Sequence, residues 1–360
     1  LVGWSLVDPT TRSIRKGACI MLRWKYSRPL LALLLVVLAV APFFTNLPLG
    51  KPGLQQTMAV AFIWGALALT YDLLFGFTGL LSFGHALYFA TGVYVSCILI
   101  NNEIVSWWLA AIIATVASGV LAALVGAASL RTTGITFAMV TLAFGEAGHV
   151  IVGRNFFNLT GGENGIALNA DFVPQFWIGV FNTKYIYWTA LIALIVTYLV
   201  IWWVTESSAG RVFAALRDNE QRVQVLGLDT QKFKLLSFVI SGTLAGMLGF
   251  VMLIAAGSAA PRFAESTVTI ALLLMVVIGG AVTRWGAVLG GIFYSFASTR
   301  MQDLTQQGSL ESIPEWIAGP IAEPALLLGL IFIFIVMFAP GGLSGAYYRL
   351  RMKAIARKHP

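Results

Sequence analysis

The stretch GRVFAALRDNEQRVQVLGLDTQKFK, residues 210–234, is a charged interruption between two apolar runs, residues 185–204 and 233–256. Each run is long enough to cross the hydrocarbon core of a bilayer as a helix, which takes about 20 residues. The stretch between them is too polar to lie in lipid, so it predicts a water-facing segment between two membrane spans. A fold of spans and loops is therefore expected.

The whole chain has the composition of a polytopic membrane protein. Of its 360 residues, 58% are hydrophobic and 11% are charged, against about 25% charged in soluble domains. Segments of strand length with alternating polarity are absent, so the spans are expected to be helical and the fold class all-α. The two cysteines, Cys19 and Cys97, have no metal-binding or CxxC spacing and are interpreted as packing residues.

Ten apolar segments are predicted to be membrane helices, some of them broken or re-entrant. The weakest are 82–101 and 285–300, which contain polar or glycine-rich stretches. The first follows a basic lead and resembles a signal peptide, but Pro42 directly after the apparent cleavage site favours an uncleaved span. The predicted spans are 29–46, 57–75, 82–101, 105–129, 133–152, 185–204, 233–256, 267–283, 285–300 and 323–340.

The distribution of charge orients these spans. With ten spans both termini share one side, and 18 of the 23 lysines and arginines fall on that side. By the positive-inside rule both termini and the 205–232 loop are cytoplasmic. This topology accounts for the basic net charge without a nucleic-acid partner. The predicted parts are a basic segment 1–28, a transmembrane domain 29–345 and a basic tail 346–360.

Two carboxylates lie at or near membrane depth. An acid in the bilayer costs on the order of 2.5–3.5 kcal/mol, so it normally faces a cavity or a partner. Asp72 is close to the cytoplasmic end of its span and could instead reach the interface. Glu146 and His149 share a helix face at i, i+3 spacing. They form either a paired interfacial cluster or the lining of an external vestibule.

Three glycine-dense stretches interrupt the apolar pattern. GLLSFGHALYFATGVY (79–94) predicts a broken helix, whose freed backbone groups can line a cavity. His85 would either hydrogen-bond the broken end or contact a substrate. GGAVTRWGAVLGG (279–291) is a second corner, and LTGGENG (159–165) is a turn-rich part of the external loop 153–184. That loop and 301–322 are long enough to meet a partner, but could also be solvated connectors.

No catalytic or nucleotide-binding pattern is present. The chain lacks GxxxxGK[ST], GxGxxG, HExxH, CxxC and GxSxG. We therefore expect a chain that is not an enzyme and has no metal site or cofactor of its own.

The charged stretch itself predicts a short helix. Asp218 can cap it, with Gln221 at its N3 position, and Gly227 suits the left-handed conformation that ends a helix. Val223 and Leu226 form a small apolar edge. Two turns are not stable alone, so the helix must dock either on its own membrane domain or on another protein, and the spacing leaves both open.

Several stretches resemble the LivM-type permeases of branched-chain amino-acid ABC importers. They occur in family order over residues 57–345. The longest is SSAGRVFAALRDNEQRVQVLGLDTQKFKLLSFVISGTLAGMLGF, and the others are GFTGLLSFGHALYFATGVY, LRTTGITFAMVTLAFGEAGHV, NLTGGENGI, LMVVIGGAVTRWGAVLGGIFY and MFAPGGLSG.

This resemblance implies a function and an assembly. The chain would form the translocation pathway for branched-chain or related amino acids in the bacterial plasma (inner) membrane. Its partners would be a homologous permease subunit, two ATP-binding subunits that hold ATP and Mg²⁺, and an external substrate-binding protein. The missing nucleotide motif agrees with ATP hydrolysis on separate subunits.

The resemblance also implies residue roles. The cytoplasmic segment would be the coupling helix, although Gln221, Arg222 and Val223 stand where such permeases usually have a Glu-Ala-Ala triplet. The implied coupling residues are Arg211, Arg217, Asp218, Asn219, Glu220, Arg222, Leu226 and Gly227. The candidates for the pathway or substrate contact are Gly84, His85, Tyr88, Thr136, Glu146, His149, Gly161 and Gly162.

Three alternatives stay open from the sequence. The same superfamily serves urea, amides and sugars. A self-sufficient secondary transporter would use a proton relay built from Asp72, His85, Glu146 or His149. A purely structural membrane subunit is the third.

Overall fold

The computed structural model describes residues 52–155, 158–177 and 182–306, together with position 42 and a few positions between 326 and 345. Nearly all of the predicted spans 29–46 and 323–340, most of the 301–322 loop and both terminal segments lie outside the described residues.

Helices make up almost all of the described chain. The apolar helices are α3 (Pro52–Asp72), continued by the π-helical turn η3 (Leu73–Thr78), α4 (His85–Asn101), α5 (Trp107–Ser129), α6 (Ile135–Gly153), α7 (Thr183–Glu206), α10 (Thr230–Ala256), α11 (Ser266–Gly279) and α12 (Arg284–Gln306). Two short helices, α8 (Ser208–Asp218) and α9 (Glu220–Val225), connect α7 to α10. The all-α prediction is confirmed.

The loop between α6 and α7 carries most of the remaining elements. It contains the 3₁₀ turns η4 (Gly162–Asn164), η5 (Ala170–Phe172) and η6 (Gln175–Trp177). Its strand β1 (Ile166–Ala167) pairs antiparallel with β2 (Ser258–Ala259), which follows α10 and precedes the 3₁₀ turn η8 (Pro261–Phe263).

Five helices of the described part are long and apolar enough to cross a membrane: Gly53–Thr78, Trp107–Ser129, Ile135–Gly153, Thr183–Glu206 and Thr230–Ala256. Two apolar helices are shorter, α4 and α11. Eight of the ten predicted spans coincide with helices, because apolar length is the signal that a bilayer-crossing helix requires. The total of ten stays a prediction.

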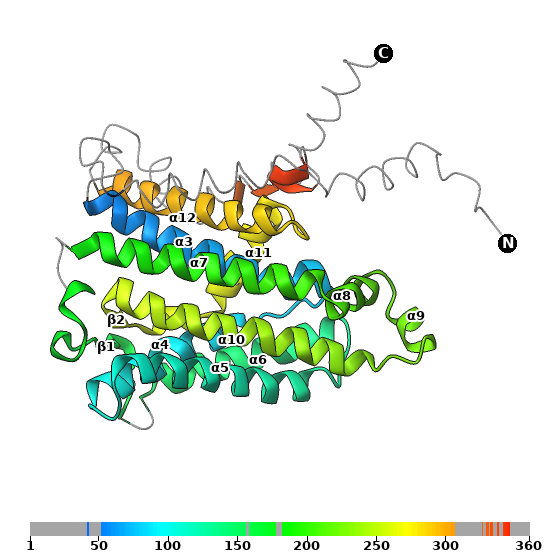
Figure 1. Ribbon diagram of the computed structural model, residues 1–360, viewed down its shortest axis with the longest axis horizontal. Coiled ribbons are helices and arrows are strands. Elements are labelled where there is room, and N and C mark those ends of the chain that lie inside the picture. Colours follow the sequence, from blue (N-terminus) through cyan, green and yellow to red (C-terminus); the bar gives the residue numbers. More distant parts are fainter. Residues whose placement is uncertain are drawn as a thin grey trace, which may run out of the picture. The chain divides into compact units, whose positions relative to one another are not determined.

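The loops separate into two sets at opposite ends of the helices. In Figure 1, α8 and α9 lie at one end, and the β1–β2 pair lies at the other. Arg284, at the start of α12, joins the α8 end, since its Nη2 donates to Glu206 Oε1 (2.9 Å). This arrangement agrees with the prediction that the loops 205–232 and 153–184 lie on opposite sides of the membrane.

Glycines allow the central helices to touch at their backbones. A Cβ on Gly92 of α4 would overlap Gly246 O of α10, and one on Gly249 would overlap Phe89 O. Small residues provide this contact between membrane helices, where the hydrophobic effect supplies little attraction. The α4–α10 pair is therefore held by close van der Waals packing.

Substitution of Gly92 by alanine should destabilise this pair. The new methyl group can be placed only if α4 and α10 separate, and overpacking of this kind costs about 1–3 kcal/mol. We expect G92A to lower the unfolding temperature in detergent. The matched control is G153A at the end of α6, where nothing lies within 4 Å of an added Cβ. Equal unfolding temperatures for the two variants would contradict the packing assignment.

Candidate functional site

The segment between α7 and α10 consists of two helices where one was predicted. Ser207 caps α8 by accepting a hydrogen bond from Gly210 N (3.3 Å). Asn219, with extended backbone, ends α8 and caps α9 by accepting from Arg222 N (3.1 Å). The prediction that Asp218 is the cap is wrong, because Asp218 is the last residue of α8. Gly227 has a φ of +79°, as predicted.

A buried aromatic ring anchors α8 on the membrane helices. Phe213 is fully buried and packs with Leu73 of η3 and Val204 of α7. Phe233 and Ile240 of α10 pack against the same cluster. The apolar face of this amphipathic helix therefore contacts three other elements at once, and any displacement of α8 must act on all three.

The second short helix is attached on one side and open on the other. Val223 of α9 is buried, and Glu220 pairs with Lys234 Nζ of α10 (2.5 Å), whose side chain is only 13% exposed. By contrast, Val225 is 87% exposed and Leu226 is 76% exposed. The predicted Val223–Leu226 edge is thus divided between the protein's own surface and the solvent.

Asp229 begins α10. It caps the helix by accepting from Lys232 N (3.3 Å), and its carboxylate forms an ion pair with Lys232 Nζ (3.2 Å). The side-chain hydrogen bond from Lys232 holds the pKa of Asp229 below its ordinary value. Both the cap and the charge of Asp229 thus fix the point at which the α8–α9 segment returns to the membrane.

The carboxylate of Asp72 lies close to α8, at the junction of α3 and η3. Asp72 is fully buried, and its Oδ1 accepts from Val282 N (3.0 Å) in the corner between α11 and α12. Asp72 is therefore enclosed by protein at the α8 end of its span, and its depth relative to the membrane interface stays a prediction. From α8, Arg217 Nη1 donates to Gly76 O of η3 (2.9 Å).

The interruption before α4 is confirmed. Residues 79–84 form neither helix nor strand, and backbone groups in and just after them bond to side chains of other helices. Phe83 N donates to Thr141 Oγ1 of α6 (3.1 Å), and Ala86 N donates to Thr269 Oγ1 of α11 (3.0 Å). Irregular backbone at membrane depth needs such partners because lipid offers none.

His85, the first residue of α4, is buried directly after this interruption. Its Nε2 lies 3.0 Å from Thr70 Oγ1, whose hydroxyl proton is donated to Leu67 O. A hydroxyl has a single proton, so Nε2 carries the imidazole proton and Nδ1 is left as an acceptor without a partner among the described residues. The rings of Tyr71 and Tyr88 meet the imidazole edge-on. His85 therefore contacts neighbouring helices and does not bond the backbone of the break.

Removal of the Thr269 hydroxyl should destabilise the interruption. T269V keeps the shape of the side chain but leaves the Ala86 N–H without its acceptor, which costs about 1–3 kcal/mol in a buried site. A lower unfolding temperature in detergent is expected. T267V, at an exposed position on the same helix, is the control. If T269V lowered the unfolding temperature no more than T267V does, the hydrogen bond from Ala86 N would contribute little to stability.

The remaining pathway candidates are dispersed. Glu146 and His149 are half-buried on α6, and no ion pair or hydrogen bond joins them among the described residues. Thr136 is exposed near the other end of α6. Gly84 and Tyr88 lie at the start of α4, where a Cβ on Gly84 would meet Thr141 O at 2.6 Å. Their roles stay predictions.

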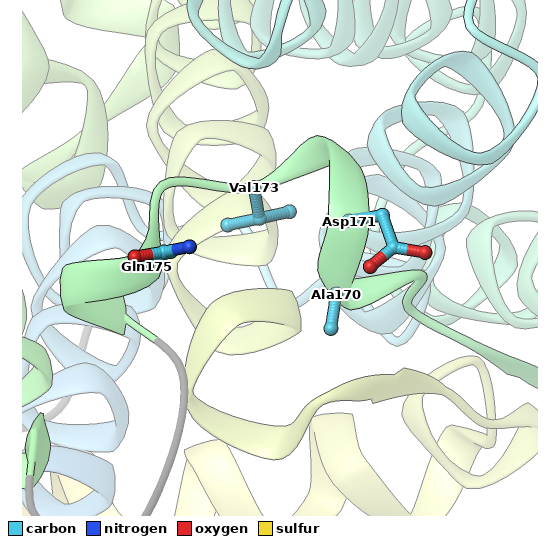
Figure 2. A pocket seen from close by; sticks show the side chains of 4 residues that line it. All are labelled: Ala170, Asp171, Val173 and Gln175. Carbon is cyan, nitrogen blue, oxygen red and sulfur yellow. The ribbon is translucent and has the colours of Figure 1, made fainter.

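The loop between α6 and α7 is held by its glycines and one threonine. Gly161 and Gly162 both have positive φ, and Thr160 Oγ1 donates to Val152 O of α6 (2.7 Å). Further along the loop, a surface pocket of about 390 Å³ is lined by Ala170, Asp171, Val173 and Gln175. Figure 2 shows Asp171 and Gln175 on opposite sides of Val173.

The structure therefore gathers the predicted coupling residues in one place and spreads the pathway candidates along α4, α6 and the external loop. Sequence reasoning missed the supporting hydroxyl groups of Thr70, Thr141 and Thr269. The signal for them is weak, since threonine in an apolar helix often bonds only its own backbone.

These features define a polytopic helical membrane protein in which a charged segment of two short helices is anchored on the apolar helices. Residues 53–339 match the family described as "Branched-chain amino acid transport system / permease component". The chain belongs to this family, and is thus a transporter subunit.

Individual permease proteins are also similar to this chain. The chain is 27% identical over 335 residues to the "High-affinity branched-chain amino acid transport system permease protein LivM" of Escherichia coli, covering 86% of this chain and 73% of that protein. It is 25% identical over 277 residues to the "Probable branched-chain amino acid transport permease protein LivM" of Methanocaldococcus jannaschii, covering 73% and 78%. LivH of Salmonella typhimurium is 25% identical over 257 residues, covering 65% and 80%. No solved structure was found to match the chain.

Proposed function

We propose that this chain is the transmembrane permease subunit of an ATP-binding-cassette importer for branched-chain or related amino acids. The observation that carries this proposal is the α8–α9 segment. It is anchored on three membrane elements by Phe213 and presents Val225 and Leu226 to the outside. An anchored helix with an exposed apolar tip is suited to transmit the movement of a protein that binds it.

The assembly follows from this role. Separate ATP-binding subunits, carrying ATP and Mg²⁺, dock on the α8–α9 segment at the cytoplasmic side of a bacterial inner membrane. A homologous permease subunit completes the pathway, and an external binding protein delivers substrate at the β1–β2 end. Nucleotide-driven closure of the ATPases then moves α8 and switches the pathway between outward and inward access.

The substrate class rests on the names of the relatives. LivM and LivH, both described as branched-chain amino-acid permeases, match most of the chain. An autoinducer 2 import permease, LsrC of Salmonella paratyphi B, matches only 39% of it. The described spans carry few fixed charges, which suits a zwitterionic substrate with an apolar side chain.

The proton-coupled alternative has little support in the geometry. Asp72, His85, Glu146 and His149 are all described residues. No hydrogen bond joins any two of them, since Asp72 bonds Val282 N and His85 bonds Thr70. A proton relay requires a connected series of such groups.

The test is uptake by liposomes that contain the chain with its co-purified permease and ATPase subunits. With the binding protein present, we expect leucine uptake that needs ATP and persists when the proton gradient is dissipated. Liposomes containing this chain alone should take up none. Uptake by the chain alone, driven by a proton gradient, would overturn the proposal.

A further inference from the structure

Three elements that are far apart in the sequence meet at the carboxylate of Asp72. The residue ends α3, and its Oδ1 accepts from Val282 N at the α11–α12 corner (3.0 Å). Its second oxygen, Oδ2, is buried and has no hydrogen-bond partner in the described part of the chain. A buried acid with one free oxygen has capacity for a further bond.

A cation that interacts with this carboxylate comes from the segment between α7 and α10. Arg217 of α8 interacts electrostatically with the Asp72 carboxylate, yet its Nη1 donates to Gly76 O (2.9 Å). Gly76 is one turn beyond Asp72, and a Cβ there would overlap Asp72 Oδ1. The missing side chain thus brings the carboxylate close to the carbonyl that Arg217 holds. The other terminal nitrogen of the guanidinium, Nη2, forms an ion pair with Asp218 Oδ1 (3.5 Å).

The elements on both sides of this contact are conformationally unusual. Leu73–Thr78 is a π-helical turn, a form that is rare and frequent at functional sites. Val282 has a φ of +70°, which is a strained conformation for a β-branched residue. The hydrogen bond from Val282 N to Asp72 helps to hold that strain.

We propose that Asp72 and Arg217 form a two-position latch that links the α8–α9 segment to the α11–α12 corner. In the first position, which the structure shows, Arg217 bonds Gly76 O and Asp72 bonds Val282 N. In the second position, Arg217 bonds the free Oδ2 of Asp72 while Oδ1 keeps its bond from Val282 N, so α8 and the α11–α12 corner are joined through one carboxylate. This inference rests on the proposed function, in which an ATPase moves α8.

The position of α8 selects between the two bonds. Phe213 packs α8 against Leu73 of η3, so a rotation of α8 about this contact changes the distance between Arg217 and the Asp72 carboxylate. Gly79, at the end of this turn, has no side chain to block that movement, whereas a Cβ there would lie 3.0 Å from Arg217 Cγ. The role of Asp72 is that of a positioning residue, since it is buried away from any docked subunit.

The experiment compares D72N with the unchanged chain in the reconstituted importer. Asparagine keeps an oxygen that can accept from Val282 N, but it cannot form an ion pair. We expect D72N to retain ATPase binding and basal ATP hydrolysis while losing substrate-stimulated hydrolysis and uptake by roughly ten-fold, within the usual range of coupling between sites. E103Q, the same acid-to-amide change at an exposed residue of the α4–α5 connection, should behave like the unchanged chain.

A double-mutant cycle separates the latch from a general structural role. If the two side chains act on each other, D72N combined with R217Q should be no worse than the more severe single variant. If each acts alone, the losses multiply. D72S, which also keeps an acceptor without the charge, replaces D72N should the latter not accumulate in the membrane.

The outcomes distinguish this inference from the proposed function. Absence of ATP-driven uptake in the unchanged complex contradicts the proposed function itself. Full uptake in the unchanged complex with normal stimulation in D72N, or with multiplicative losses in the double variant, overturns the latch alone.

Discussion

The double substitution V225D/L226D is expected to abolish association of the ATP-binding subunits with this chain. Both side chains are largely exposed at the end of α9, and a hot-spot side chain at the centre of an interface is worth about 2 kcal/mol or more. Loss of one such contact reduces affinity roughly 30-fold, and two charges in place of two apolar groups add a desolvation cost. Co-purification with tagged ATPase subunits and ATP-driven uptake should both disappear.

The chain itself should remain folded in this variant, because the two side chains contribute little to its own packing. The control is L159D, which places one aspartate at an exposed leucine of the loop between α6 and α7. L159D should leave ATPase association unchanged. Equal loss of ATPase association in both variants would indicate a general folding defect. Retained association in V225D/L226D would place the docking surface elsewhere.

The substitution F213A is expected to detach α8 from the membrane helices. Phe213 is fully buried among Leu73, Val204 and the side chains around them, and Phe→Ala in a packed core costs about 3–5 kcal/mol. An 11-residue helix has little stability without that contact. We expect rapid proteolysis within residues 205–232 and a loss of ATP-driven uptake, even where ATPase subunits still bind.

F213L provides the comparison for this prediction. Leucine fills most of the same space, so protection from proteolysis and uptake should be largely retained. If F213A were as resistant to proteolysis as the unchanged chain, the anchoring role of the ring would be refuted.

Much of the fold could be predicted from apolar length alone. A span must be long and apolar whatever its neighbours. The eight predicted spans that lie in the described residues, the first at 57–75 and the last at 285–300, therefore coincide with helices. The same local signals predicted the break before His85 and the left-handed Gly227. These features depend on a residue's own conformation, which the sequence shows directly.

The features that escaped prediction depend on distant partners. The cap of α9 was assigned to Asp218 because a carboxylate there fits a capping pattern, whereas α8 continues through it to Asn219. The signal for α8 was present, since Val212, Phe213 and Leu216 recur at helical spacing. The burial of Asp72 could not be foreseen, because its partner Val282 is 210 residues away.

The central claim is that a separate ATPase moves this chain by its α8–α9 segment, and site-specific photocrosslinking tests it most directly. A photoreactive amino acid at position 226, in membranes that contain the ATPase subunits, should give an adduct with the ATPase. The same amino acid at position 159 should give none. No ATPase adduct from position 226, in a complex that still transports, would contradict the account.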